Sequence, residues 1–259
     1  MPESKGERSL ELYIEVAPGG DALVHAPSLP GFSVKVGRGA SRGRRLRGGL
    51  SAYARWAATH GLVSARLAAL VAREAKWREV ETVAGAPVWI SGNAAALFSV
   101  DRRTLSDREV TEHLDVVAAA LSDMAAAVAG LSAEDRAHGR RTGGRSIDEA
   151  FTHVGNCIWW YASRIDDRLP EPEEDPAEAP LDRCVRLLAD AQAYLLSISG
   201  KARVRVHVPT RFPTYDPSEA WTHAKACRRE AEHAWDHLAG VRRAAAATRR
   251  RLPRATSRG

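Results

Sequence analysis

Three histidines carry the strongest chemical signal in this sequence. His233 and His237 lie four residues apart in the segment RREAEHAWDHL, and His153 lies in FTHVGNCIWWYASRI. Both segments have the apolar periodicity of helices, and residues four apart on a helix share one face. If the two helices pack together, three imidazoles can converge on one divalent ion, zinc or nickel above all, and leave a fourth coordination position open for chemistry. The spacing therefore predicts a metal site of His153, His233 and His237.

Glu230 is the candidate catalytic residue beside this site. It lies one helical turn before His233, where a carboxylate can accept a ring N–H or act as a base toward a bound water. An alternative interpretation is a surface carboxylate paired with an arginine such as Arg229. The histidines have an alternative as well, because i, i+4 pairs also occur as solvated or core side chains without a metal. The aromatic residues nearby, Trp159 to Tyr161 and Trp235, either line a ligand pocket or belong to the core.

The size and composition of the chain allow one large domain or two ordinary ones. It has 259 residues, of which 44% are hydrophobic, enough to bury a core. The polar N-terminus MPESKGERSL and the absence of a run of eighteen apolar residues predict a cytoplasmic protein that does not contact a membrane. The cysteines, Cys157, Cys184 and Cys227, are odd in number and lie in expected helices, so we expect free thiols in a reducing compartment.

The net charge of +6 comes from the C-terminus. Residues 242–259 hold seven arginines and no acid, which leaves a net charge of about −1 on the rest of the chain. We therefore expect a basic disordered tail over 246–259 and do not expect nucleic acid as a partner.

Two periodicities divide the sequence. Residues 10–36 contain three short strand-like runs separated by PGGD and PSLPG turns, which predict an antiparallel meander, and a helix follows from about Ser41 to His60. Residues 62–100 are ambiguous, with a helix-like SARLAALVAREA and two candidate strands, WREVETV and PVWI. From Thr104 onward the period is helical, and capping boxes start the first two helices. The four expected helices cover residues 106–131, 146–165, 181–198 and 216–241, the last starting at Asp216-Pro217-Ser218-Glu219.

The predicted fold class is α+β. Residues 1–100 form a small antiparallel three-stranded sheet with a helix and a linker, and residues 101–245 form an up-down four-helix bundle. The loop 171–180 and the segment 201–216 connect bundle ends, so we expect them to set specificity.

The helical half resembles the DinB-like superfamily of four-helix bundles, which includes YfiT-type metal-dependent hydrolase relatives and thiol S-transferases. The resemblance covers about residues 104–241. It depends on RSIDEAFTHVGNCIWWYASRI and EAWTHAKACRREAEHAWDHL, which are similar to the second and fourth helices of that family. It implies a metal triad of His153, His233 and His237, zinc or nickel as the ion, and a small thiol or other small molecule as the substrate.

Residues 8–61 resemble a HicB-type antitoxin domain through LELYIEVAPGGDALVHAPSLPGFSVKV and the helix after it. This resemblance implies an accessory or dimerising domain, so a homodimer is one arrangement that the sequence allows.

Two functions are consistent with these observations. The first is a metal-dependent S-transferase or hydrolase that activates a thiol or water. The alternative is a non-catalytic binding or regulatory protein in which the HicB-like domain engages a protein or RNA partner.

Overall fold

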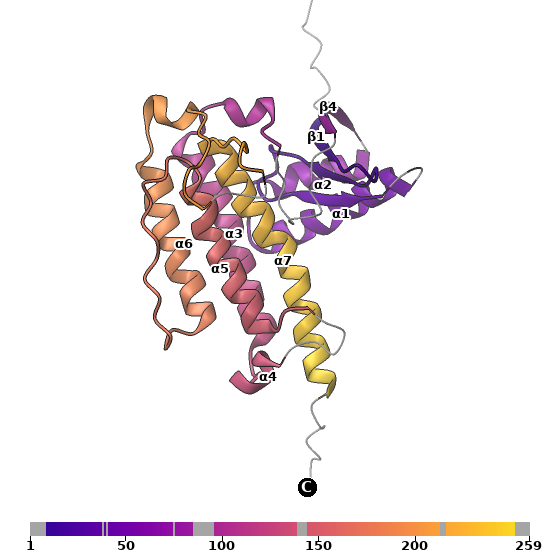
Figure 1. The fold of residues 1–259 in the computed structure, drawn as a ribbon. Helices are drawn as coiled ribbons and strands as arrows, with labels where there is room; N and C mark the ends of the chain where they lie inside the picture. The colour runs from indigo at the N-terminus through magenta and orange to yellow at the C-terminus, as the bar shows by residue number, and fades with distance from the viewer. Residues whose placement is uncertain are drawn as a thin grey trace, which may run out of the picture.

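The computed structural model describes residues 9–37, 39, 41–74, 76–84, 96–138, 144–212 and 216–251. Its N-terminal part contains strands β1 (Leu10–Val16), β2 (Ala22–His25), β3 (Ser33–Val36) and β4 (Trp77–Ala84) with helices α1 (Ser41–Thr59) and α2 (Ala65–Glu74). Its C-terminal part contains η1 (Ser99–Arg102), α3 (Asp107–Val128), α4 (Ala133–Ala137), α5 (Ile147–Ser163), α6 (Pro180–Ser197), η2 (Gly200–Val204) and α7 (His223–Arg251). The expected α+β class is confirmed. In Figure 1 the sheet with α1 and α2 lies on one side of α7, and α5 and α6 lie on the other.

The sheet has four strands in the order β3-β2-β1-β4 and is mixed, so the prediction of a three-stranded antiparallel sheet is wrong. The predicted meander is present, with Ile14 opposite Val24 and Val24 opposite Val34. The fourth strand comes from WREVETV and pairs in parallel with β1. A parallel pair needs a long crossover, which α1 and α2 supply here. Trp77, Glu81 and Val83 of β4 are half-buried, and the other residues of the strand are exposed. The other candidate strand, PVWI, lies outside the described residues.

Helices α3, α5, α6 and α7 form the bundle, in which α7 packs against α3 and α5, and α6 packs against the same two helices. Both predicted capping boxes are confirmed. The side chains of Ser106 and Ser146 accept hydrogen bonds from the backbone N–H groups of Glu109 and Glu149, which satisfies donors that a helix start leaves unpaired.

The predicted up-down order of the bundle is wrong, because α5 and α6 run parallel. Near the helix starts, Cys184 of α6 donates to the carbonyl of Phe151 of α5 over 3.0 Å. Near the ends, Tyr194 of α6 donates to Asp166, just beyond α5. The connection over 164–179 can extend roughly 50 Å, about twice the length of α5, so the chain can return along the bundle before α6 begins.

Helix α7 begins at His223, and the Asp-Pro-Ser-Glu pattern at Asp216 proved to be a turn. The Asp216 carboxylate accepts hydrogen bonds from the backbone N and the Oγ of Ser218. The helix is capped by Thr222, whose Oγ1 accepts from the backbone N of Lys225 over 3.2 Å. The Asp-Pro-Ser-Glu sequence, which predicted a helix start, therefore forms a turn in the segment before α7.

At its other end α7 continues through Arg251. Residues 246–251, expected in a disordered tail, are therefore helical, and residues 252–259 lie outside the described part of the chain. Among the helices in the described ranges, none has the length and hydropathy needed to cross a membrane.

The sheet part and the bundle share one apolar core. Gly31, in the turn between β2 and β3, lies so close to α3 that a Cβ there would be 2.4 Å from Cγ1 of Val116. Trp235 of α7 packs edge-on to Tyr53 of α1, with ring centroids 5.5 Å apart, and lies 4.5 Å from Trp56. These contacts hold the two predicted domains against each other.

A group of buried charges crosses the same interface. His25 of β2 lies between Glu15 of β1 and Glu232 of α7, at 3.3 and 2.8 Å. Arg228 joins Glu232 to Asp101 of η1 at 3.3 and 2.7 Å. All five side chains are at most 2% exposed. Because an unpaired buried charge is costly, each member depends on the others, and the group sets how the sheet sits on the bundle.

Candidate metal centre

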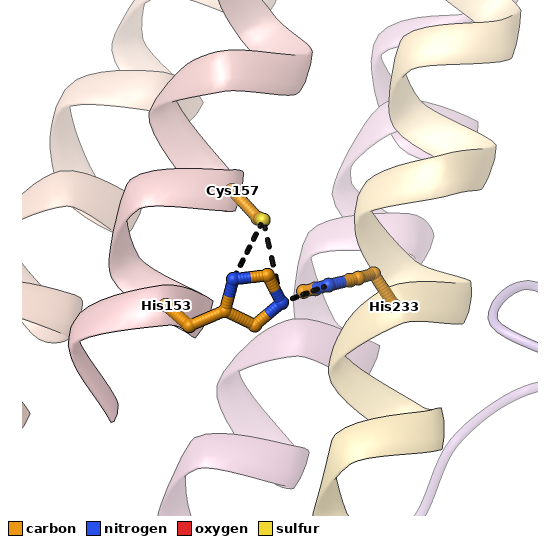
Figure 2. A group of neighbouring side chains, drawn as sticks. All are labelled: His153, Cys157 and His233. Carbon is orange, nitrogen blue, oxygen red and sulfur yellow. Dashed lines mark hydrogen bonds between the residues drawn. The ribbon is translucent and has the colours of Figure 1, made fainter. Parts of the chain in front are cut away.

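The facing sides of α5 and α7 bring His153, Cys157 and His233 together (Figure 2). His153 and Cys157 lie one turn apart on α5, and His233 reaches toward them from α7. Nε2 of His153 is 3.2 Å from Nε2 of His233, and Sγ of Cys157 is 3.9 Å from Nε2 of His153. One candidate donor atom from each residue lies within 4.8 Å of the other two.

These separations are close to those around a tetrahedral zinc ion. With Zn–N of about 2.05 Å and Zn–S of about 2.3 Å, two nitrogens are separated by about 3.3 Å, and a nitrogen and a sulfur by about 3.6 Å. The His153–His233 distance is within about 0.2 Å of that value, and the Cys157–His153 distance is about 0.3 Å longer. The donor atom of Cys157 is held only within 4.8 Å of that of His233, so the three side chains can hold a zinc-sized ion if Cys157 moves toward the two histidines.

The two imidazoles are uncharged at neutral pH. Burial lowers the pKa of His153 to about 4. Burial also lowers the pKa of His233 well below its usual value, and His237 and His153 add to this effect. Burial raises the pKa of Cys157 to about 12, so the thiol keeps its proton in the metal-free protein. Neutral ring nitrogens offer free lone pairs, whereas the thiol must release a proton to bind an ion.

His237, the third member of the predicted triad, lies beside this group. Its ring centroid is 4.3 Å from that of His233 and 4.8 Å from that of His153. Within the described residues, however, Cys157 and not His237 completes the set whose donor atoms approach one another. The structure thus brings His153 and His233 together as predicted and adds Cys157. The i, i+4 spacing of His153 and Cys157 was the signal that could have identified it.

Glu230 is buried on α7 and only 1% exposed. Neither of its carboxylate oxygens has a hydrogen-bond partner among the described residues, so it accepts no ring N–H from His233. Burial raises its pKa to about 8, so the group is a neutral acid at neutral pH. The alternative pairing with Arg229 is not present either, because Arg229 binds Glu232 at 2.6 Å. The catalytic role of Glu230 stays a prediction.

The nearby aromatic residues mainly build the core. Tyr161 lies closest to the candidate site among them, with its ring centroid 5.5 Å from that of His233. Trp235 faces α1, and Trp160 packs edge-on to the buried Trp221 at 5.5 Å. The interpretation of these residues as core is therefore favoured over a ligand-binding wall.

Two cavities reach the candidate site, and Ser146 lines both. The first is open, has a volume of about 470 Å³ and extends to His153 along Asp148, Thr152 and Asn156. The second has a volume of about 180 Å³ and extends to His237. The described lining of neither cavity includes the loop 171–180 or the segment 201–216, which were predicted to set specificity.

The fold and the site define an α+β protein whose helical bundle carries a histidine and cysteine cluster able to hold a metal ion. No protein-family model, curated protein or solved structure matches this chain. The resemblances to DinB-like and HicB-like proteins therefore stay predictions.

Proposed function

We propose that the protein is a metal-dependent enzyme of the DinB-like type, which activates water or a low-molecular-weight thiol for hydrolysis or S-transfer. Zinc or nickel would be held by His153, His233 and Cys157, with His237 beside the open coordination position. The N-terminal part would be a HicB-like accessory domain that packs against α3 and α7.

The observation that carries this proposal is the 3.2 Å separation of Nε2 of His153 and Nε2 of His233. The two atoms come from α5 and α7. They belong to neutral imidazoles, each of which has one unprotonated ring nitrogen at neutral pH. Two such nitrogens can share a hydrogen bond or an ion, and the adjacent Cys157 thiol favours the ion, because Cys and His together form typical zinc sites. A bound ion would supply a Lewis acid that lowers the pKa of a coordinated water or thiol.

The other residues would shape the reaction. Tyr161 and the apolar core of the bundle cover one side of the histidines and keep water away. The two cavities beside Ser146 leave the side of His153 and His237 accessible to small molecules. Glu230, a neutral acid held one helical turn from His233, would store a proton near the site.

Elemental analysis tests the metal. The protein is purified without a metal-affinity tag, supplemented with zinc or nickel, and exchanged into metal-free buffer. We expect one ion per chain for the wild type and a large loss for His153→Ala, His233→Ala and Cys157→Ala. His138→Ala is the matched control, because His138 is exposed and its ring contacts the carbonyl of Glu134, outside the candidate metal centre. A wild type without metal, or a His153→Ala variant with full stoichiometry, would overturn the metal site.

Activity requires a second assay. The metal-loaded protein is tested for transfer of 2-mercaptoethanol to 1-chloro-2,4-dinitrobenzene and for hydrolysis of 4-nitrophenyl acetate. We expect at least one rate to exceed that of the His153→Ala variant. If the protein binds the metal but neither rate exceeds that of the His153→Ala variant, the enzyme proposal is contradicted for these reaction classes.

The exposed arginines of α1 favour one alternative, a regulatory protein in which the N-terminal part engages RNA. Arg44, Arg45 and Arg47 lie exposed near the start of this helix, where their charges can contact phosphates. Filter binding of a labelled RNA would then fall with salt and with substitution of the three arginines by glutamine. Undetectable or salt-insensitive binding would remove RNA and leave a protein as the partner in this alternative.

A further inference from the structure

The smaller of the two cavities beside the candidate metal centre has a distinctive lining, and we call it the Arg145 cavity. Its volume is about 180 Å³, and Ala150, Val241 and Ala244 supply an apolar floor. Arg145, Ser146 and His237 are the polar residues of its lining. Gly240 also lines it. The cavity therefore has room for a short apolar chain that ends near a cation.

Arg145 is exposed and makes no ion pair with any residue in the described ranges. The nearest acids along the chain have other partners. Asp148 binds Arg136 at 3.0 Å, and Glu149 accepts the backbone N–H of Ser146 in the capping box. The guanidinium of Arg145 thus remains available to a ligand, and a carboxylate matches its planar, two-donor geometry.

The charge of Arg145 acts at the candidate site itself. Burial is the main cause of the lowered pKa of His153 and His233, and Arg145 lowers both further. It lowers the pKa of His237 in the same way. Arg145 and His237 line the same cavity of about 180 Å³, so a short-chain anion bound to Arg145 can extend to His237.

We propose that the Arg145 cavity binds the carboxylate end of a small aliphatic substrate, and that Arg145 is the residue that selects this charge. The inference rests on the proposed function, because it names the substrate class of the same site. The apolar part of the substrate packs on Val241 and Ala244, and its reactive end points toward His237. The larger cavity, which has Asp148 and Glu149 in its lining, suits a neutral or cationic second substrate.

Binding of three matched probes tests this proposal. Pentanoate, 1-pentanol and pentylammonium have the same chain and differ in charge, and calorimetry measures their affinities for metal-free and zinc-loaded protein. We expect the wild type to prefer pentanoate over 1-pentanol by about five-fold, a size typical of an ion pair at a partly exposed site. Arg145→Gln should abolish the preference, Arg145→Lys should keep part of it, and Arg66→Gln, at an exposed arginine of α2, should leave it unchanged. Gly240→Leu should weaken all three probes by filling the cavity.

Two results would overturn the inference. One is equal binding of pentanoate and 1-pentanol by the wild type. The other is a preference that survives Arg145→Gln and disappears without zinc, since the carboxylate would then bind the ion directly. Zinc content is measured on the same samples. A wild type that binds no zinc contradicts the proposed function, whereas an Arg145-dependent preference in the metal-free protein still supports the anion site.

Discussion

His25 and Glu232 lie 207 positions apart in the chain, and Nδ1 of the histidine is 2.8 Å from Oε1 of the glutamate in the buried interface between sheet and bundle. Each also contacts a further buried charge, since His25 meets Glu15 and Glu232 meets Arg228. The pair joins the two halves of the protein by charge within their buried interface.

Removal of Glu232 should strongly destabilise the fold. Glu232→Ala leaves His25 and Arg228 buried without a carboxylate between them, and loss of one member of a buried pair costs about 3–5 kcal/mol. Urea denaturation measures the free energy of unfolding. Asp236→Asn is the control, because Asp236 is 58% exposed and its pair with Lys35, at 3.4 Å, lies at the surface. Equal effects of the two substitutions would contradict the role of the buried charges.

The contribution of His25 should depend on pH. Burial alone would lower the pKa of His25, but Glu232 and Glu15 outweigh burial, and the pKa is raised. Protonated His25 therefore stabilises the fold fully below its unfolded pKa of about 6.5, and this stabilisation is lost as the pH rises through the folded pKa. We expect the difference in free energy of unfolding between wild type and His25→Gln to be largest in mild acid and to shrink at alkaline pH. A difference that grew with pH would show that His25 is neutral in the folded protein.

Glu230 should have the same sign of pH dependence for a different reason. Burial raises its pKa to about 8, so the folded protein holds the proton more tightly than the unfolded chain, and stability falls as the pH rises from about 4.5 to 8. Glu230→Gln stays neutral and should gain stability relative to wild type over this range, by up to a few kcal/mol. Glu174→Gln, in an exposed loop, is the matched control. A pH-independent difference would mean that Glu230 is ionised and paired.

Cobalt substitution should identify the third ligand. A thiolate bound to Co²⁺ produces strong near-ultraviolet charge-transfer absorption, which histidine ligands do not. We expect this absorption in the wild type and in His237→Ala, and its loss in Cys157→Ser. If the cobalt-loaded wild type lacks this absorption, Cys157 is not a ligand and His237 is the candidate for the third ligand.

Gly31→Ala should weaken the docking of the sheet on the bundle. Gly31 has a φ of +82°, and a Cβ would lie 2.4 Å from Val116. The left-handed backbone costs about 1 kcal/mol for alanine, and overpacking adds about 1–3 kcal/mol. Gly19→Ala is the control, because a Cβ there meets nothing within 4 Å. Thermal unfolding that changed equally in both variants would contradict the close contact with α3.

Much of the local structure could be predicted from the sequence. Ser106 and Ser146 marked two helix starts, since a capping box needs only residues three positions apart. The meander was also predictable because turns and strand periodicity are local. The approach of His153 and His233 was anticipated because each lies on a helix face that could point into a bundle.

The remaining features depended on which distant segments meet. The chain by itself determined the α+β class, most helix boundaries and the histidine pair. The tertiary structure decided that β4 lies beside β1, that α5 and α6 run parallel, that Cys157 replaces His237 in the closest set of donor atoms, and that His25 meets Glu232. These outcomes share one physical reason. Each depends on packing and charge pairing between residues far apart in the chain, whose free energy no local pattern encodes.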